Sequence, residues 1–340
     1  MGERGSREVN MLICAATTIT MRITMLTRWL VMAALLLLAG CSSLGIADRP
    51  LDELQQRYSN ERSQYLTIGA LNIHYRDEGK RDGPVILMLH GVASSLHTWD
   101  GWVQALAPHY RLVRIDLPAH GLTGPDPDRE RYDIDYMVEV LREFTQQLQL
   151  PRFVLAGNSL GGYISWNYAL AHPQQVDKLI LLDAAGYPQD MPFIMSLASW
   201  PLVGEMSQWF MPRFIVGMNV REAYGDSDKV TAELVRRYHD LSLRPGNRQG
   251  LTAVFRTMKE QSSNEQLGDR VAEVTTPTLL MWGALDDWVP LSVMERFAAD
   301  LPDVDVIVYD GVGHMPMEEI PARSAADAHR FIQAASIAAE

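Results

Sequence analysis

The stretch that most constrains the fold runs from Phe153 to Tyr163 and reads FVLAGNSLGGY. Its first four residues are apolar, as in a strand that is buried on both faces of a sheet, and a helical run over 163–172 follows. Between them stands a serine, Ser159, enclosed by Gly157 and Gly161. A strand that turns at once into a helix brings two backbones close together, so a Cβ on either glycine is expected to collide with a neighbour. The turn should leave the Ser159 hydroxyl exposed at the carboxyl edge of the sheet, with the helix N-terminus beneath it.

Strands and helices alternate on both sides of this turn. A short apolar run predicts a buried strand over 85–89, further strands are predicted over 112–116, 178–183, 277–282 and 304–309, and a hairpin over 65–76 precedes them. Helices are predicted between the strands, and the clearest covers 135–148, where the apolar residues fall at helical spacing. This order predicts an α/β fold with a mostly parallel central sheet flanked by helices on both faces.

Five motifs resemble those of the α/β-hydrolase fold family, and they follow one another along the chain in the order found in that family. The strand, the Gly-x-Ser-x-Gly turn and the helix resemble its nucleophile elbow. The others are His90-Gly91-Val92, the loop DLPAHGLTG over 116–124, WGALDDWVP over 282–290 and GVGHMP over 311–316. The resemblance covers roughly residues 65–335. It implies an α/β-hydrolase core made of residues 65–185 and 269–340, with a helical cap inserted over 186–268.

The predicted cap contains no convincing strand. Its first part, over 187–218, is rich in proline, methionine and tryptophan, and its second part reads as helices over 228–241 and 246–260. For any one of these residues, packing inside the cap is the simpler interpretation. Together, a methionine-rich layer above an active site suits a deformable pocket for an acyl chain, because thioethers pack against irregular apolar shapes.

A serine hydroxyl is a weak nucleophile until a base takes its proton and an acid orients that base. In the family that this chain resembles, the partners follow in the order serine, acid, histidine. For Ser159, the base is predicted to be His314, which lies in a loop directly after a strand, whereas His329 lies inside a helical run. The resemblance places the acid at Asp286.

Two other aspartates compete for the role of the acid. Asp287 is adjacent to Asp286, and spacing alone does not exclude it. Asp183 follows another strand, at a position that supplies the acid in some relatives, and it is expected to be structural here.

The oxyanion formed during attack needs backbone N–H groups that are already in place. The resemblance implies that Leu160, the residue after the nucleophile, supplies one, and that Val92 in the His-Gly-x motif supplies the other. In this motif His90 normally braces the loop. Asp116 and His120 are likewise expected to hold a loop together.

The nucleophile and its flanking loops narrow the reaction class. Enzymes of the haloalkane dehalogenase type carry an aspartate where Ser159 stands, so dehalogenation is not the expected reaction. Carbon–carbon hydrolases of the ring-cleavage type have a similar elbow. They usually carry a glycine-rich loop after His-Gly, where this chain has residues 92–95 (VASS). They also usually carry a tryptophan after the catalytic histidine, where this chain has Met315. The resemblance implies a carboxylesterase or a lipase that works through an acyl-enzyme. A monoacylglycerol lipase is one such enzyme. A carbon–carbon hydrolase, or a non-catalytic ligand-binding homologue, is the alternative.

The amino terminus resembles a bacterial lipoprotein signal. A basic segment precedes Trp29–Ala39, an unbroken apolar run of 11 residues. A bilayer span needs about 20 residues, so this length suits a secretory signal instead. Residues 38–41 (LAGC) resemble a lipobox, which implies cleavage before Cys41 and acylation of that cysteine; a plain signal peptide is the alternative. In lipoproteins of this kind, an aspartate directly after the cysteine tends to retain the protein at the inner membrane. Ser42 stands at that position here, so the resemblance implies the outer membrane of the cell envelope. We therefore predict a signal peptide over 1–40 and a tether over 41–64.

Composition restricts the partners. The net charge is −12 and no Lys/Arg-rich run occurs, which argues against nucleic acid. The two cysteines are Cys14, in the predicted signal, and Cys41, so neither remains for an internal disulfide. No metal-ligating constellation is recognised and no cofactor is expected. The expected partners are a small-molecule ester or lipid, and the membrane through Cys41.

Overall fold

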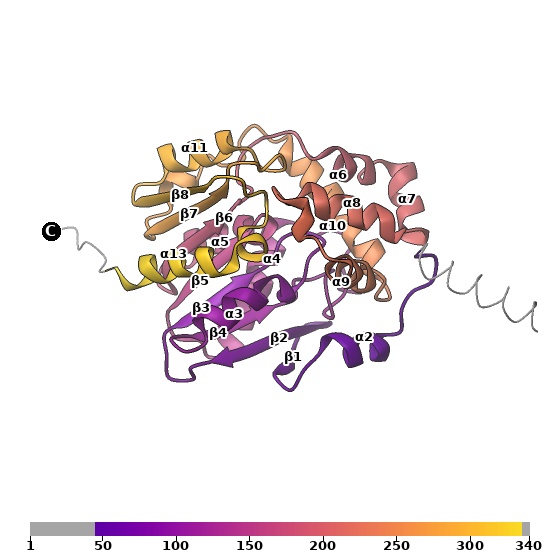
Figure 1. Ribbon diagram of the computed structural model, residues 1–340, viewed down its shortest axis with the longest axis horizontal. Coiled ribbons are helices and arrows are strands. Elements are labelled where there is room, and N and C mark those ends of the chain that lie inside the picture. Colours follow the sequence, from indigo (N-terminus) through magenta and orange to yellow (C-terminus); the bar gives the residue numbers. More distant parts are fainter. Residues whose placement is uncertain (1–44, 335–340) are drawn as a thin grey trace, which may run out of the picture.

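The computed structural model describes residues 45–334, so the predicted signal peptide and Cys41 lie outside the described residues. Figure 1 shows a central sheet with helices on both sides. The sheet has eight strands in the order β1-β2-β4-β3-β5-β6-β7-β8. β2 is antiparallel to β1 and β4, and the pairs from β4 to β8 are parallel. The predicted α/β class is confirmed.

The elements have the following bounds. The strands are β1 (Ser63–Ile68), β2 (Leu71–Gly79), β3 (Val85–Leu89), β4 (Arg111–Ile115), β5 (Phe153–Asn158), β6 (Val176–Leu182), β7 (Thr278–Gly283) and β8 (Val304–Tyr309). The helices outside the insertion are α2 (Leu51–Tyr58), α3 (Asp100–Leu106), α4 (Ile134–Gln147), α5 (Leu160–Ala171), α11 (Leu291–Asp300), α12 (Pro316–Glu319) and α13 (Pro321–Gln333). The helices inserted between β6 and β7 are α6 (Phe193–Ala198), α7 (Pro201–Trp209), α8 (Arg213–Glu222), α9 (Ala232–Ser242) and α10 (Asn247–Ser262).

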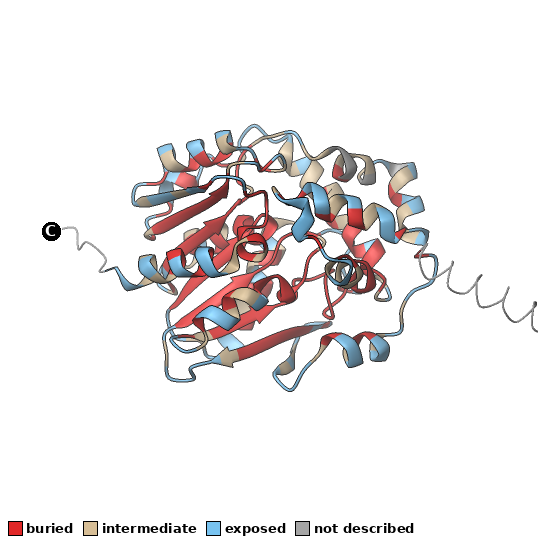
Figure 2. Ribbon diagram, in the orientation of Figure 1, coloured by how far each residue is buried: buried red, intermediate tan, exposed pale blue. Residues whose placement is uncertain are grey.

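The central strands are buried on both faces, as their colour in Figure 2 shows. In β3, Leu87 packs in the same layer as Phe144 of α4, while Met88 packs in the opposite layer with Trp102 of α3. Successive side chains of a strand point to opposite faces. A strand that is covered on both faces therefore needs an apolar residue at every position, which is why β3 reads as an unbroken apolar run.

The inserted helices gather at one end of the sheet (Figure 1). The sequence predicted a helical cap with helices at α9 and α10, but gave no bounds for α6, α7 and α8 in its proline-rich first part. The prolines stand where helices begin: Pro192 and Pro212 are the N-cap residues of α6 and α8, and Pro201 is the first residue of α7. Proline is tolerated at a helix start because the first N–H groups have no partner within the helix. Across residues 45–334, no helix combines the length and apolar character that crossing a bilayer requires.

The prediction of a tether over 41–64 is wrong from residue 45 onward, because α2 packs on the folded domain. Leu54 and Tyr58 lie on one side of α2 and are buried against Leu241 of α9. The Tyr58 hydroxyl and the Arg57 guanidinium also donate to the buried Asp240 carboxylate, at 2.8 and 3.1 Å. Most of α2 is polar, so hydropathy suggests a solvated linker, although two inward-facing residues and one buried carboxylate are enough to dock it.

Candidate active site

Ser159 lies between β5 and α5 in a strained backbone conformation. Its φ is 53° and its ψ is −114°, and a positive φ is uncommon for a residue with a Cβ. A Cβ on Gly157 would lie 2.3 Å from the Gly161 carbonyl oxygen, and one on Gly161 would lie 2.3 Å from the Leu89 oxygen. Both glycines are therefore required by close backbone approach, as the sequence predicted. The strain and the two glycines together turn Ser159 out of the strand.

His314 and Asp286, the predicted base and acid, form a hydrogen-bonded pair. His314 Nδ1 lies 2.7 Å from Asp286 Oδ2, and both side chains are buried. The other oxygen of Asp286 accepts hydrogen bonds from the N–H groups of Trp288 and Val289, at 2.8 and 3.0 Å. The neighbouring Asp287 is exposed. The turn after β7 thus directs the Asp286 side chain towards His314 and leaves Asp287 outside the site.

Ser159 and His314 meet at two cavities. The smaller one has a volume of about 60 Å³ and the larger one about 400 Å³, and both residues line both cavities. Ser159, Asp286 and His314 are thus brought together from turns that follow β5, β7 and β8. His329 is elsewhere, on α13, where its ring bonds to the Tyr110 hydroxyl at 2.8 Å.

The two N–H groups predicted for the oxyanion site also lie here. Leu160 is the first residue of α5, and Val92 lines the larger cavity. Neither N–H has a hydrogen-bond acceptor within residues 45–334. A Cβ on Gly91 would lie 3.2 Å from the Ser159 Cβ, so the loop that carries Val92 passes directly beside the serine. Both groups are therefore available to an oxygen bound next to Ser159.

His90 braces this loop, as the motif implied. Its Nε2 accepts from the Leu117 N–H at 3.0 Å, and its Nδ1 donates to the Gly91 carbonyl at 2.7 Å. Burial lowers the pKa of His90, and it lowers the pKa of His120 to about 3. Both rings are therefore neutral, and they hold their loops in place through hydrogen bonds.

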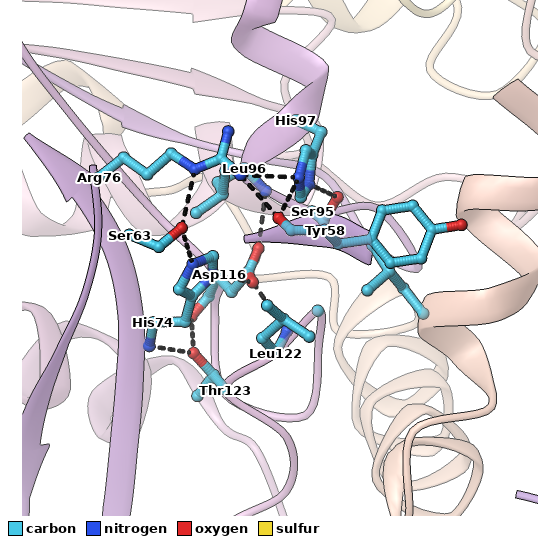
Figure 3. A network of polar contacts seen from close by, with 12 residues as sticks. Tyr58, Ser63, His74, Arg76, Ser95, Leu96, His97, Asp116, Leu122 and Thr123 are labelled. Carbon is cyan, nitrogen blue, oxygen red and sulfur yellow. Dashed lines mark hydrogen bonds and ion pairs between the residues drawn. The ribbon is translucent and has the colours of Figure 1, made fainter. Parts of the chain in front are cut away.

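A second Ser–His–Asp chain lies near the edge of the sheet (Figure 3). His74 Nδ1 lies 2.7 Å from Asp116 Oδ2, and His74 Nε2 lies 3.0 Å from the Ser63 hydroxyl. Burial would raise the pKa of Asp116, but His74 outweighs it and holds that pKa below its usual range. The same carboxylate accepts from the N–H groups of Leu96 and Leu122, both at 2.8 Å.

This second chain is structural. Ser63 lines neither of the cavities at Ser159, and its hydroxyl also accepts from the Arg76 guanidinium at 3.2 Å. The Asp116 carboxylate holds the loop over 116–124 in place, which is the role predicted for it.

Two residues that hold His314 in position were not recognised in the sequence. The buried Glu319 carboxylate accepts from the N–H groups of Gly313, Gly225 and Asp226, at 2.9 to 3.0 Å. It thereby ties the His314 loop to the insertion. The Asn158 amide donates to the His314 carbonyl at 3.1 Å. Nothing in the local sequence distinguishes Glu319 from an exposed helical glutamate.

Asp183 lies behind the His314–Asp286 pair. It is fully buried at the end of β6, and its Oδ1 accepts from the Gly283 N–H at 2.9 Å. One oxygen of each aspartate and one ring nitrogen of His314 all lie within 4.8 Å of one another. The pKa of Asp183 is raised well above its usual range, first by burial and then by the negative charge of Asp286.

A protonated Asp183 explains this arrangement. A neutral carboxyl can donate its proton to the Asp286 carboxylate, whereas two buried negative charges at this distance would repel one another. Asp183, Asp286 and His314 are also the one cluster of possible metal ligands within residues 45–334. Because Asp286 already binds His314 and two backbone N–H groups, these residues fit a hydrogen-bonded chain better than an open metal site.

We expect Asp183→Asn to change how stability depends on pH. An unfolded aspartate titrates at about pH 4. Between that pH and the higher folded-state pKa, the folded protein holds one more proton, so its free energy of unfolding falls as pH rises. The asparagine cannot titrate, and the variant should gain stability relative to wild type as pH rises above about 4. Urea unfolding at several pH values measures this, with Asp177→Asn, at an exposed position on the same strand, as control. Parallel wild-type and Asp183→Asn curves would contradict a protonated Asp183.

Comparisons with known proteins agree with this architecture. A family model described as alpha/beta hydrolase fold matches residues 84–321. A monoacylglycerol lipase of Xenopus laevis is 26% identical over 284 residues, which cover 77% of this chain and 79% of the relative. The structure of a putative lipase from Acinetobacter baumannii matches with a TM-score of 0.68 at 21% identity, covering 83% of this chain and 94% of that one. A meta-cleavage product hydrolase from Pseudomonas fluorescens matches with a TM-score of 0.71 at 21% identity, covering 80% and 98%. At these identities, the two structures show likeness of fold alone.

Proposed function

The chain belongs to the alpha/beta hydrolase fold family, and from this premise we propose that it is a serine hydrolase that cleaves carboxylic esters. The observation that carries the proposal is the buried His314–Asp286 pair, which shares a cavity wall with the strained Ser159. We further propose that it acts as a carboxylesterase or lipase, and that a lipid on Cys41 anchors it to the cell envelope. The apolar character of the larger cavity supports a lipid-like ester.

The proposed reaction has two halves. His314 takes the Ser159 proton as the serine oxygen attacks the ester carbonyl, and the N–H groups of Val92 and Leu160 hold the resulting oxyanion. His314 then gives the proton to the leaving alcohol, which leaves an acyl group on Ser159. A water, activated by the same histidine, hydrolyses this acyl-enzyme. Asp286 keeps the imidazole in the tautomer that accepts the proton at Nε2.

The larger cavity is the proposed acyl site. Its volume of about 400 Å³ lies within the range of ligand-binding pockets. From the cap its lining includes Met206, Ile215, Val216, Val220, Leu251 and Phe255. None of the described residues that line either cavity is a lysine, arginine, aspartate or glutamate. An uncharged ester with an apolar acyl chain therefore suits this site better than a substrate with a carboxylate, which would find no cationic partner.

The acyl-chain profile tests this proposal. Burial of a methylene contributes about 0.8 kcal/mol, so kcat/KM for p-nitrophenyl esters should rise about fourfold per methylene until the cavity is full. Ile215→Trp would fill part of the cavity. It should lower kcat/KM for long acyl chains at least about tenfold and leave acetate hydrolysis nearly unchanged. Met218→Trp, on the exposed side of the same helix, is the matched control. A wild-type profile that does not depend on chain length would argue against an acyl site.

A further inference from the structure

The outward side of the cap carries exposed apolar side chains on two consecutive helices. Leu202 and Trp209 of α7 are 74% and 68% exposed, and Phe214 and Met218 of α8 are 65% and 57% exposed. Trp200, directly before α7, is 60% exposed. In Figure 2 the ribbon of these helices is largely in the exposed and intermediate colours. We refer to these five residues as the outer cap face. Contiguous exposed apolar residues on a soluble domain mark an interaction surface.

The same two helices are also apolar on their inner side. Val203 of α7 and Ile215, Val216 and Val220 of α8 line the cavity beside Ser159. A helix with apolar residues on both sides is typical of a segment enclosed by apolar surroundings. The cavity accounts for the inner residues, and the outer cap face has no partner among residues 45–334.

The start of the described chain lies against the turn between the two helices that carry this face. The Gly45 carbonyl accepts from the N–H of Met211, in the turn between α7 and α8, at 3.3 Å. A Cβ on Gly45 would lie only 2.1 Å from the Met211 oxygen, so this contact is close. An ion pair of 2.6 Å between Asp48 and Arg248 holds the next residues. Figure 1 shows this first segment running beside the cap.

We infer that the outer cap face docks on the surface of a lipid bilayer. Cys41 precedes Gly45 by four residues, and an extended chain of that length reaches at most about 14 Å. A lipid on Cys41 would therefore hold the bilayer beside Met211, between α7 and α8. Tryptophan, phenylalanine and leucine are among the side chains that enter the membrane interface. The acyl site would then lie just behind the helices that contact the lipid. This inference rests on the lipid anchor and ester substrate of the proposed function.

Hydrogen exchange on the protein, expressed as the full chain so that Cys41 can be processed and acylated, tests the docking. Vesicles of phosphatidylethanolamine and phosphatidylglycerol should slow amide exchange in α7 and α8 at least about fivefold and leave α13 unchanged. The double variant Trp209→Ser/Phe214→Ser should lose this protection. It should still hydrolyse p-nitrophenyl acetate at the wild-type rate, because neither residue lines the cavities. Val306→Ser/Val308→Ser removes exposed apolar side chains from β8 instead and should keep the protection.

Two outcomes would overturn the inference. One is unchanged exchange in α7 and α8 while the protein is bound to vesicles. The other is protection that needs no vesicles and grows with protein concentration, which would mean that a second copy covers the face. The proposed function is tested by separate measurements. A wild type that is inactive towards esters would reject the esterase, and an unmodified peptide across Gly40-Cys41 in mass spectrometry would reject the anchor. Neither measurement depends on the exchange result.

Discussion

Replacing Ser159 by alanine is expected to lower kcat for p-nitrophenyl ester hydrolysis at least about 10,000-fold, because no acyl-enzyme can form without the hydroxyl. The residual rate would come from binding and from the oxyanion N–H groups alone. Steady-state assays with a short ester measure the loss. Ser63→Ala is the matched control, since Ser63 belongs to the second Ser–His–Asp chain and lines neither cavity at Ser159.

The control also separates chemistry from folding. Circular dichroism and thermal unfolding should show that Ser159→Ala remains folded, since alanine keeps the Cβ and removes only the hydroxyl. A fluorophosphonate should label wild type and Ser63→Ala but not Ser159→Ala. Undiminished hydrolysis by Ser159→Ala would reject the proposed nucleophile. A wild type that is folded but stays unlabelled would favour the non-catalytic ligand-binding homologue.

Asp286→Asn is expected to lower kcat about 10,000-fold, the second large effect. The carboxylate holds the Nδ1–H of His314, at 2.7 Å, and stabilises the imidazolium that forms when Ser159 loses its proton. An amide at this position offers an N–H to the ring and favours the tautomer that cannot accept the serine proton. The short-ester assay over a range of pH values measures the loss.

Asp287→Asn provides the adjacent control. Asp287 is exposed, and the N–H groups of Trp288 and Val289 bind Asp286 instead. We expect kcat for this variant to stay within about twofold of wild type, as for most exposed substitutions. Equal losses in the two variants would mean that the conformation of the turn, rather than the carboxylate on His314, controls the rate.

Much of the fold followed from local patterns. The central strand β3 was predicted to within a residue, because a strand covered on both faces must be apolar throughout. The elements that were missed depend on distant contacts. α2 docks through two apolar side chains and Asp240 of α9. Glu319 binds backbone groups some ninety residues away in the sequence, which no local pattern records.

The sequence by itself determined the elbow and the order of its partners. Gly157, Ser159 and Gly161 are neighbours along the chain, and the close approach of Gly157 to the Gly161 carbonyl is a local requirement. Only the tertiary structure decided which aspartate faces His314, because adjacent residues of a turn point in different directions, and it is Asp286 that binds the imidazole and two backbone N–H groups. It also brought Asp183 beside Asp286 and Gly45 beside Met211. These contacts join segments that are far apart in the chain, and their energies depend on burial and charge that arise only when the sheet and the cap have assembled.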